Sequence, residues 1–262
     1  MVVIILLVSL GASVVGAISG IGGGVIIKPV MDSFDVFPVA TINFLTTCAV
    51  LAMTIVTLYR NRNSTIKLDK RISTILAFGG VAGGLVGKQL FDMLKHSFQN
   101  EAVVGSTQYI LLIILTVGVL FFTLLKHKVR PQMHTGFLFI LFTGLGLGAV
   151  ASFLGIGGGP INLAVLYLFF SMDSKKAALN SIYIIFFSQL TSILSSLIQR
   201  KVPDFDPLVL MLMIIGGVSG GLIGSWISKK LSLRGVDKLF CAVMGIIILI
   251  STYNLVRFAT QG

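Results

Sequence analysis

Charged residues are scarce in this chain, and acidic residues are the scarcest. Only 11% of the 262 residues are charged and only nine are Asp or Glu, whereas soluble domains carry about 25% charged residues. A soluble protein of this size leaves much of its surface in water and could not hide so many apolar side chains. With 55% hydrophobic residues, the composition indicates a protein whose solvent is the lipid bilayer.

The chain also lacks the signatures of metal sites and of common membrane enzymes. There is no HExxH sequence and no P-loop, which disfavours an intramembrane metalloprotease and an ATP-driven pump. Cys48 and Cys241 lie inside apolar runs without metal-site or disulfide spacing. All nine acidic residues fall at or near the ends of apolar runs, so no mid-membrane carboxylate for a proton relay is apparent. We therefore predict no catalytic residues, no metal and no cofactor.

The net charge of +11 lies in short clusters between apolar runs. Nucleic-acid binding would call for a basic face with interleaved aromatic residues, which is missing. Basic clusters between apolar runs are typical of the cytoplasmic loops of membrane proteins. The first run, 2–18, lacks the basic segment of a signal peptide and has a near copy in mid-chain, so we expect it to be structural. We expect a lipid bilayer as partner and no nucleic acid.

An internal repeat divides the chain into two halves. The GIGGG stretch at Gly20–Gly24 recurs at Gly155–Gly159, an offset of 135 residues, and the glycine-rich stretch Gly79–Gly87 recurs at Gly216–Gly224, an offset of 137. Matches in one order at nearly one spacing indicate a duplicated unit. We expect a first repeat at 1–126, a cytoplasmic linker at 127–134 and a second repeat at 135–262.

Each half is expected to hold a glycine-broken hairpin followed by three longer helices. The hairpins are predicted at 2–34 and 135–172, and the helices near 37–59, 72–94 and 105–125, then 177–199, 207–228 and 238–256. Backbone polar groups in lipid must be satisfied within a segment, which favours helices, and the runs lack the strict alternation of barrel strands. The sequence therefore predicts an all-α integral membrane protein.

The charges of the loops favour the hairpin over a plain span. If each break is a hairpin, the basic loops 60–71, 126–134, 172–176 and 229–238 fall on one side, and the near-neutral loops 95–104 and 200–206 fall on the other. The alternative, four simple spans per half, violates the positive-inside rule. With the hairpin, the two repeats are inverted and both termini lie outside, the plan of many secondary transporters. The short run 25–34 reaches only about half a bilayer, so one arm is expected to be re-entrant.

The two glycine breaks form the candidate substrate site. Irregular backbone at membrane depth is tolerated only where it is buried in protein or lines a cavity. The helix after each break begins with free N–H groups and a positive dipole end, which favour an anion. The alternative is that the glycines only permit a tight turn and close packing. The candidates are Gly20, Gly22, Gly23 and Gly24, with Gly155, Gly157, Gly158 and Gly159 in the second break.

Polar side chains after each break extend this candidate site. Asn43 and Asn180 occupy equivalent positions, each with two donors and an acceptor, and Thr46 and Gln189 lie further along the same two helices. Because an unpaired amide in lipid is costly, both asparagines must face substrate or another helix. Interhelical hydrogen bonding remains the alternative to substrate binding.

Lys28, four residues after the first break, is a candidate for attracting an anion. A cation inside an apolar run is a functional hypothesis by default. It could instead extend to the membrane surface, and Asp32 is one turn away and could pair with it. Its counterpart in the second half is Leu163.

The stretches Gly79–Gly87 and Gly216–Gly224 have glycines spaced by four residues. This spacing lets two helices pack with their backbones in contact. No strand precedes either stretch, which argues against a dinucleotide-binding loop.

The two glycine breaks, the asparagine after each and the glycine-rich third helix of each half resemble the TauE/SafE family of sulfite and organosulfur-anion exporters, also called the toluene sulfonate uptake permease family. The resemblance covers essentially the whole chain. It implies a secondary transporter, expected to be an exporter, that carries sulfite, a sulfonate or a related anion across the bacterial inner membrane, with a proton or sodium ion as the coupling ion. The residues that match are Gly20, Gly22–Gly24, Asn43, Gly155, Gly157–Gly159 and Asn180. An anion channel of the same fold and a non-transporting membrane scaffold remain alternatives.

Overall fold

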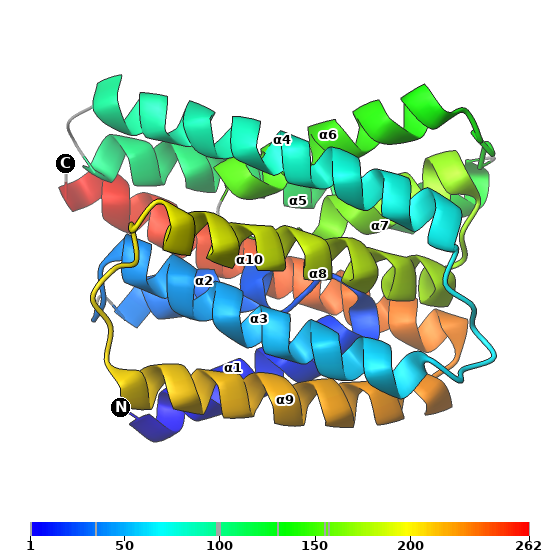
Figure 1. Cartoon of the computed structure of the whole chain (residues 1–262), viewed down its shortest axis with the longest axis horizontal. Coiled ribbons are helices and arrows are strands. Elements are labelled where there is room, and N and C mark those ends of the chain that lie inside the picture. Colours follow the sequence, from blue (N-terminus) through cyan, green and yellow to red (C-terminus); the bar gives the residue numbers. More distant parts are fainter. Residues whose placement is uncertain are drawn as a thin grey trace.

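The computed structural model describes residues 2–34, 36–97, 101–129, 131–154, 156 and 158–261 (Figure 1). This described part is helical, as predicted, with short connections. The first half contains α1 (Val2–Ser19), α2 (Gly24–Phe34), α3 (Val39–Asn61), α4 (Lys70–Ser97) and α5 (Glu101–Leu125), followed by the single 3-10 turn η1 (Lys126–Lys128). The second half contains α6 (Phe137–Phe153), α7 (Pro160–Phe170), α8 (Ser174–Ile198), α9 (Pro207–Lys230) and α10 (Leu233–Gln261).

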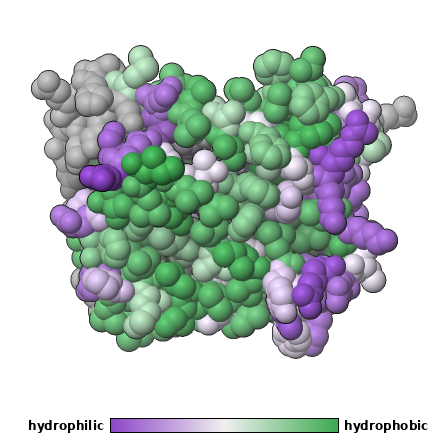
Figure 2. Space-filling model, in the orientation of Figure 1, coloured by the Kyte–Doolittle hydropathy of each residue, from purple (hydrophilic) through white to green (hydrophobic). Residues whose placement is uncertain are grey.

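Six of these helices, three in each half, are long and apolar enough to cross a membrane: α3, α4, α5, α8, α9 and α10. Many large apolar side chains lie on the outside of the molecule, among them Phe78, Ile198 and Leu249. Figure 2 shows hydrophobic residues across the middle of the visible face and hydrophilic residues gathered at its two sides. This distribution is the one expected of a multi-pass membrane protein, whose middle faces lipid and whose ends face water.

Aspartates at segment ends start three of the long helices. Asp173 accepts hydrogen bonds from the backbone N–H groups of Lys175 and Lys176 at the start of α8. Asp206 caps α9 in the same way, and Asp69 accepts from the N–H of Ile72 at the start of α4. A side-chain acceptor here satisfies N–H groups that have no partner in the first turn. Several of the few carboxylates therefore serve as caps.

The glycine-rich stretches form close helix contacts, which confirms the predicted packing role. Gly79, Gly83 and Gly87 of α4 lie against the backbone of α6, while Gly216, Gly220 and Gly224 of α9 lie against α1. A β-carbon at Gly83 would overlap the carbonyl group of Leu145. Each glycine-rich helix thus packs on the first helix of the opposite half, with the backbones in contact.

The other helix contacts also occur in equivalent pairs, in which the helices of the first and second halves are interchanged. α3 packs on α9 as α8 packs on α4, and α2 packs on α10 as α7 packs on α5. α3 also packs on α8, and α5 on α10. The first half therefore contacts the second through matched pairs of elements, and neither half forms a separate bundle.

The connections gather at two opposite ends of the bundle (Figure 1). One end, which we call the basic end, carries the connections 62–69, 126–129 with 131–136, 171–173 and 231–232. The other, which we call the open end, carries both chain termini and the connections 36–38 and 199–206. Five of the six predicted loops are partly helical, because neighbouring helices extend into them. For example, α10 begins at Leu233 inside the predicted loop 229–238, α8 begins at Ser174 inside the predicted loop 172–176, and η1 opens the predicted loop 126–134. Part of the predicted loop 95–104 lies outside the described residues.

Candidate functional site

Glycine is required at both breaks by backbone conformation. Gly20 and Gly22 have φ angles of 78° and 75°, and Gly158 and Gly159 have φ angles of 126° and 149°. Residues with a β-carbon rarely adopt these values. Gly155 and Gly157, the remaining glycines predicted in the second break, lie outside the described residues.

The two breaks contact each other in the middle of the bundle. A β-carbon on Gly24 would lie 3.0 Å from the carbonyl oxygen of Ile156, and one on Gly159 would lie 3.1 Å from Val25. The side chain of Ile185, on α8, covers both Gly22 and Gly158. Gly20 and Gly23 are buried as well. In this conformation the described glycines of the breaks are packed against protein and form a closed layer across the bundle.

A cavity of about 690 Å³ lies between this layer and the open end. Its wall includes Pro38, Lys201 and Pro203 from the open-end connections, and Ala151 and Ser152 at the end of α6, just before the second break. Its other polar wall residues come from α2, α3, α4, α5 and α8: Lys28, Asp32, Asn43, Thr47, Lys88, Gln108, Tyr109, Ser188, Gln189, Thr191, Ser192, Ser195 and Ser196.

The cavity wall is cationic and partly apolar. Three lysines, Lys28, Lys88 and Lys201, face a single described carboxylate, Asp32. Aromatic rings from Phe44, Phe91 and Phe258 and several aliphatic side chains complete the wall. Positive charge in a cleft with low-dielectric walls raises the local concentration of anions, and the apolar part offers contacts to an organic group.

Lys28 is buried in this wall and paired. Its Nζ lies 3.0 Å from Oδ2 of Asp32, with side chains only 4% and 2% exposed, and 5.4 Å from the ring centre of Tyr109. The pairing anticipated from the four-residue spacing is therefore present, and Lys28 does not extend to the surface. The ammonium group is therefore buried in the cavity wall beside Asp32 and Tyr109.

Asp32 is the centre of a polar cluster that the sequence did not reveal. The hydroxyl of Tyr109 donates to Asp32 Oδ2 at 2.5 Å. From α10, Asn254 donates to the carbonyl oxygen of Pro29 at 2.9 Å, and Arg257 donates to the backbone oxygen of Asp32 at 2.8 Å. Asp32 lies near the C-terminal end of α2. Side chains of α5 and α10 cover this end of the helix. The position of Asp32 near a segment end agrees with the sequence analysis, whereas its burial, at 5% exposure, was not predicted.

The two equivalent asparagines have different surroundings. Asn43 lies in the cavity wall, and its Oδ1 is buried without a hydrogen-bond partner among the described residues. Asn180 is fully buried near the basic end. Its Oδ1 accepts from the backbone N–H of Asp69 at 2.9 Å and from the hydroxyl of Ser73. Asn180 therefore makes an interhelical contact, the alternative left open above, whereas Asn43 lies in the cavity wall and its Oδ1 makes no such contact.

The two remaining predicted site residues, Gln189 and Thr46, also lie in different surroundings. Gln189 is 3% exposed and lies in the cavity wall. Thr46 is buried beside Gly24, with its methyl group 3.4 Å from the position of a β-carbon there, and is absent from that wall. The structure thus brings Lys28, Asn43 and Gln189 to one cavity, whereas the described glycines of the breaks and Thr46 are absent from its wall.

Comparison with known proteins places the chain in a family. The family model described as "Sulfite exporter TauE/SafE" matches residues 5–251, nearly the whole chain. The chain belongs to the TauE/SafE family. A relative from Bacillus subtilis (strain 168), described as "Probable membrane transporter protein YunE", is 24% identical over 260 residues, covering 89% of this chain and 91% of that protein. A search of solved structures found no match.

TauE/SafE membership agrees with the long apolar helices and the hydrophobic middle of the molecule. The protein is thus a multi-pass membrane protein of a transporter family and not an enzyme.

Proposed function

We propose that this protein is a secondary transporter of a small organosulfur anion, such as a sulfonate or sulfite, and that it works by alternating access as an exporter. The observation that carries this proposal is the cavity itself. It opens at one end of the bundle, is lined by three lysines against one carboxylate, and ends at the closed layer of glycine breaks. A passage open at one end and closed at the other is what a carrier needs in one of its two states.

The equivalent pairs of helix contacts between the two halves support an inverted repeat, with a first unit at 1–126 and a second at 135–262. An inverted pair offers two similar conformations, one open to each side. The positive-inside rule assigns the basic end to the cytoplasm, so that both termini lie outside an inner membrane. The conformation described here is then open to the outside.

The anion is proposed to bind in the cavity above the breaks, and the breaks to form the constriction that it crosses. Lys28 supplies the charge, while Asn43 and Gln189 supply hydrogen-bond donors. The first candidate position, between the glycines, is filled by Ile185, Val25 and Ile156 in this conformation. A cavity of about 690 Å³ is far larger than one oxyanion needs, and its aromatic wall favours an anion with an organic part.

Flux into proteoliposomes tests this function. Purified protein would be reconstituted and assayed with sulfite, sulfoacetate, a simple carboxylate and chloride, with and without an imposed proton or sodium gradient. We expect saturable flux, fastest for the organosulfonate, that responds to one of the two gradients. Flux that never saturates and shows no counterflow would mean a channel. No flux of any anion through folded protein would remove the transport proposal and favour a scaffold.

A further inference from the structure

A second, much smaller cavity lies at the basic end of the bundle. Its volume is about 30 Å³, room for about one water molecule, and its wall includes Leu163, Tyr167, Ser174 and Asp237. Ser19, the last residue of α1 before the first glycine break, also lies in this wall. The small cavity therefore reaches the closed layer of glycines from the side opposite to the large cavity.

The α2 and α7 residues of the two cavities are equivalent in the repeat. Leu163 and Tyr167 in the small cavity stand 135 residues after Lys28 and Asp32 in the large one, which is the offset of the two glycine breaks. Helices α2 and α7 thus present matching positions to cavities on opposite sides of the breaks.

Helices α5 and α10 also make equivalent contacts with each other at the two ends of the bundle. At the open end, Phe258 of α10 lies against Gly105 of α5, with its ring 3.0 Å from the position of a β-carbon. At the basic end, Lys126 after α5 bonds to Asp237 of α10. Lys126 and Phe258 are 132 residues apart in the sequence, and so are Gly105 and Asp237. This spacing is shorter than the 135 and 137 of the glycine stretches and equals the distance between the first residues of α5 and α10, Glu101 and Leu233. The same pair of positions therefore meets at both ends, as an ion pair at one and as a glycine–ring contact at the other.

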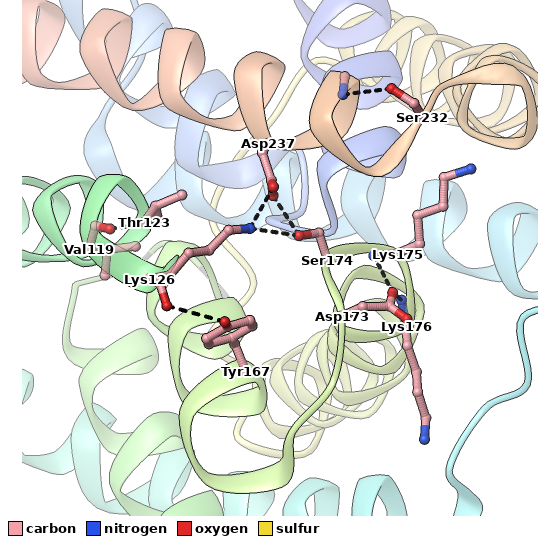
Figure 3. A network of polar contacts seen from close by, with 11 residues as sticks. Val119, Thr123, Lys126, Tyr167, Asp173, Ser174, Lys175, Lys176, Ser232 and Asp237 are labelled. Carbon is pink, nitrogen blue, oxygen red and sulfur yellow. Dashed lines mark hydrogen bonds and ion pairs between the residues drawn. The ribbon is translucent and has the colours of Figure 1, made fainter. Parts of the chain in front are cut away.

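The ion pair at the basic end is well connected (Figure 3). Lys126 Nζ lies 2.6 Å from Asp237 Oδ2, with side chains 10% and 25% exposed. The hydroxyl of Ser174, at the start of α8, accepts from Lys126 at 3.0 Å and donates to Asp237 at 2.5 Å. The hydroxyl of Tyr167 donates to the carbonyl oxygen of Lys126 at 3.3 Å. One lysine thus ties α5, α7, α8 and α10 together over the small cavity.

We propose that the Lys126–Asp237 ion pair is the gate at the basic end, and that the small cavity is the collapsed counterpart of the large one. The inference rests on the proposed transport of an anion. When the gate opens, Asp237 separates from Lys126 and the ammonium group becomes a binding group for the anion on its way through the basic end. An anion and Asp237 compete for one ammonium group, so an anion that has crossed the breaks favours the open gate.

Cysteine labelling in the full-length protein tests the gate. In a background without Cys48 and Cys241, Leu163→Cys reports on the small cavity and Ser192→Cys on the large one, with a membrane-impermeant maleimide as the probe. We expect Asp237→Asn to raise the labelling rate of Leu163→Cys by about fivefold, the size of effect that the loss of one partly exposed ion pair produces. The labelling rate of Ser192→Cys should fall, because one cavity closes as the other opens.

The exchanged pair Lys126→Asp with Asp237→Lys should restore slow labelling of Leu163→Cys. Lys176→Gln is the matched control, since it removes a cation at the same end whose pair with Asp69 is long, at 4.0 Å, and more exposed; it should change neither rate. Faster labelling at both reporters would mean that the pair only holds the helices together, and no change at either would also overturn the gate. Labelling needs no substrate, so this outcome is independent of the anion flux assay.

Discussion

At the scale of single residues, equivalent positions in the two halves have separate tasks. Asn43 and Asn180 are related by the repeat, yet one lies in the wall of a cationic cavity and the other joins α8 to the start of α4. The sequences around the two asparagines are too similar to predict that their roles differ. What separates them is the set of partners, because Asp69 and Ser73 lie more than a hundred positions before Asn180 and come to it only through the fold.

Alanine substitution should reveal this division. Asn180→Ala leaves the N–H of Asp69 and the hydroxyl of Ser73 without their acceptor, at a cost of about 1–3 kcal/mol for each buried group. Asn43→Ala removes no internal hydrogen bond made by its Oδ1, so stability should change by about 0.5 kcal/mol or less. Its anion flux at low substrate concentration should fall about tenfold, as the loss of a hydrogen bond to a charged group implies.

Thermal unfolding in detergent and flux in proteoliposomes measure the two effects side by side. A stable but inactive Asn180→Ala together with an unstable Asn43→Ala would reverse the assignment.

At the scale of helices, glycine has two structural roles. In the breaks it supplies backbone conformations with positive φ that begin α2 and α7 in the middle of the bundle. In α4 and α9 it lets the first helix of the opposite half approach until the backbones touch. Both uses follow from the missing β-carbon, so both were visible in the sequence as glycine spacing.

The packing role predicts opposite effects for two glycines in neighbouring helices. Gly83→Ala places a β-carbon against the carbonyl of Leu145, which belongs to helix backbone and cannot move aside, so it should destabilise the protein by about 1–3 kcal/mol. Gly118→Ala in α5 meets no atom within 4 Å and should stabilise it by about 0.5–1 kcal/mol. Unfolding of the two variants in the same detergent is the comparison. Equal changes in the stability of the two variants would show that the backbones of α4 and α6 are too far apart for a β-carbon at Gly83 to reach Leu145.

Much of this architecture could be predicted because repeats and apolar runs are local patterns. The breaks, the glycine contacts and the pairing of Lys28 with Asp32 all follow from spacing along the chain. The burial of Asp32 could not, because α2 starts in mid-bundle and is covered by α5 and α10, far away in sequence. The Lys126–Asp237 pair was hidden for the same reason, since both residues fall in stretches expected to be solvated loops.

At the scale of the whole molecule, the protein has a cavity on each side of a closed layer of glycine breaks. The large cavity holds a buried Lys28–Asp32 pair, and the small one lies under the Lys126–Asp237 pair. The buried pair is held in a low-dielectric wall, where removing one partner alone would leave an uncompensated charge and cost about 3–5 kcal/mol. A variant that neutralises both residues together therefore tests the role of the charge with less risk to folding.

Counterflow of a labelled organosulfonate in proteoliposomes, with the double variant Lys28→Gln and Asp32→Asn beside the unmodified protein, tests the central claim most directly. Lys229→Gln, which removes an exposed cation at the basic end, is the matched control. We predict saturable exchange by the unmodified protein and by Lys229→Gln, and an apparent affinity at least about tenfold weaker in the double variant, because a charge-assisted contact to the anion is lost. Exchange with unchanged affinity in the folded double variant would contradict the account, because the anion would then cross without using the cavity that Lys28 lines.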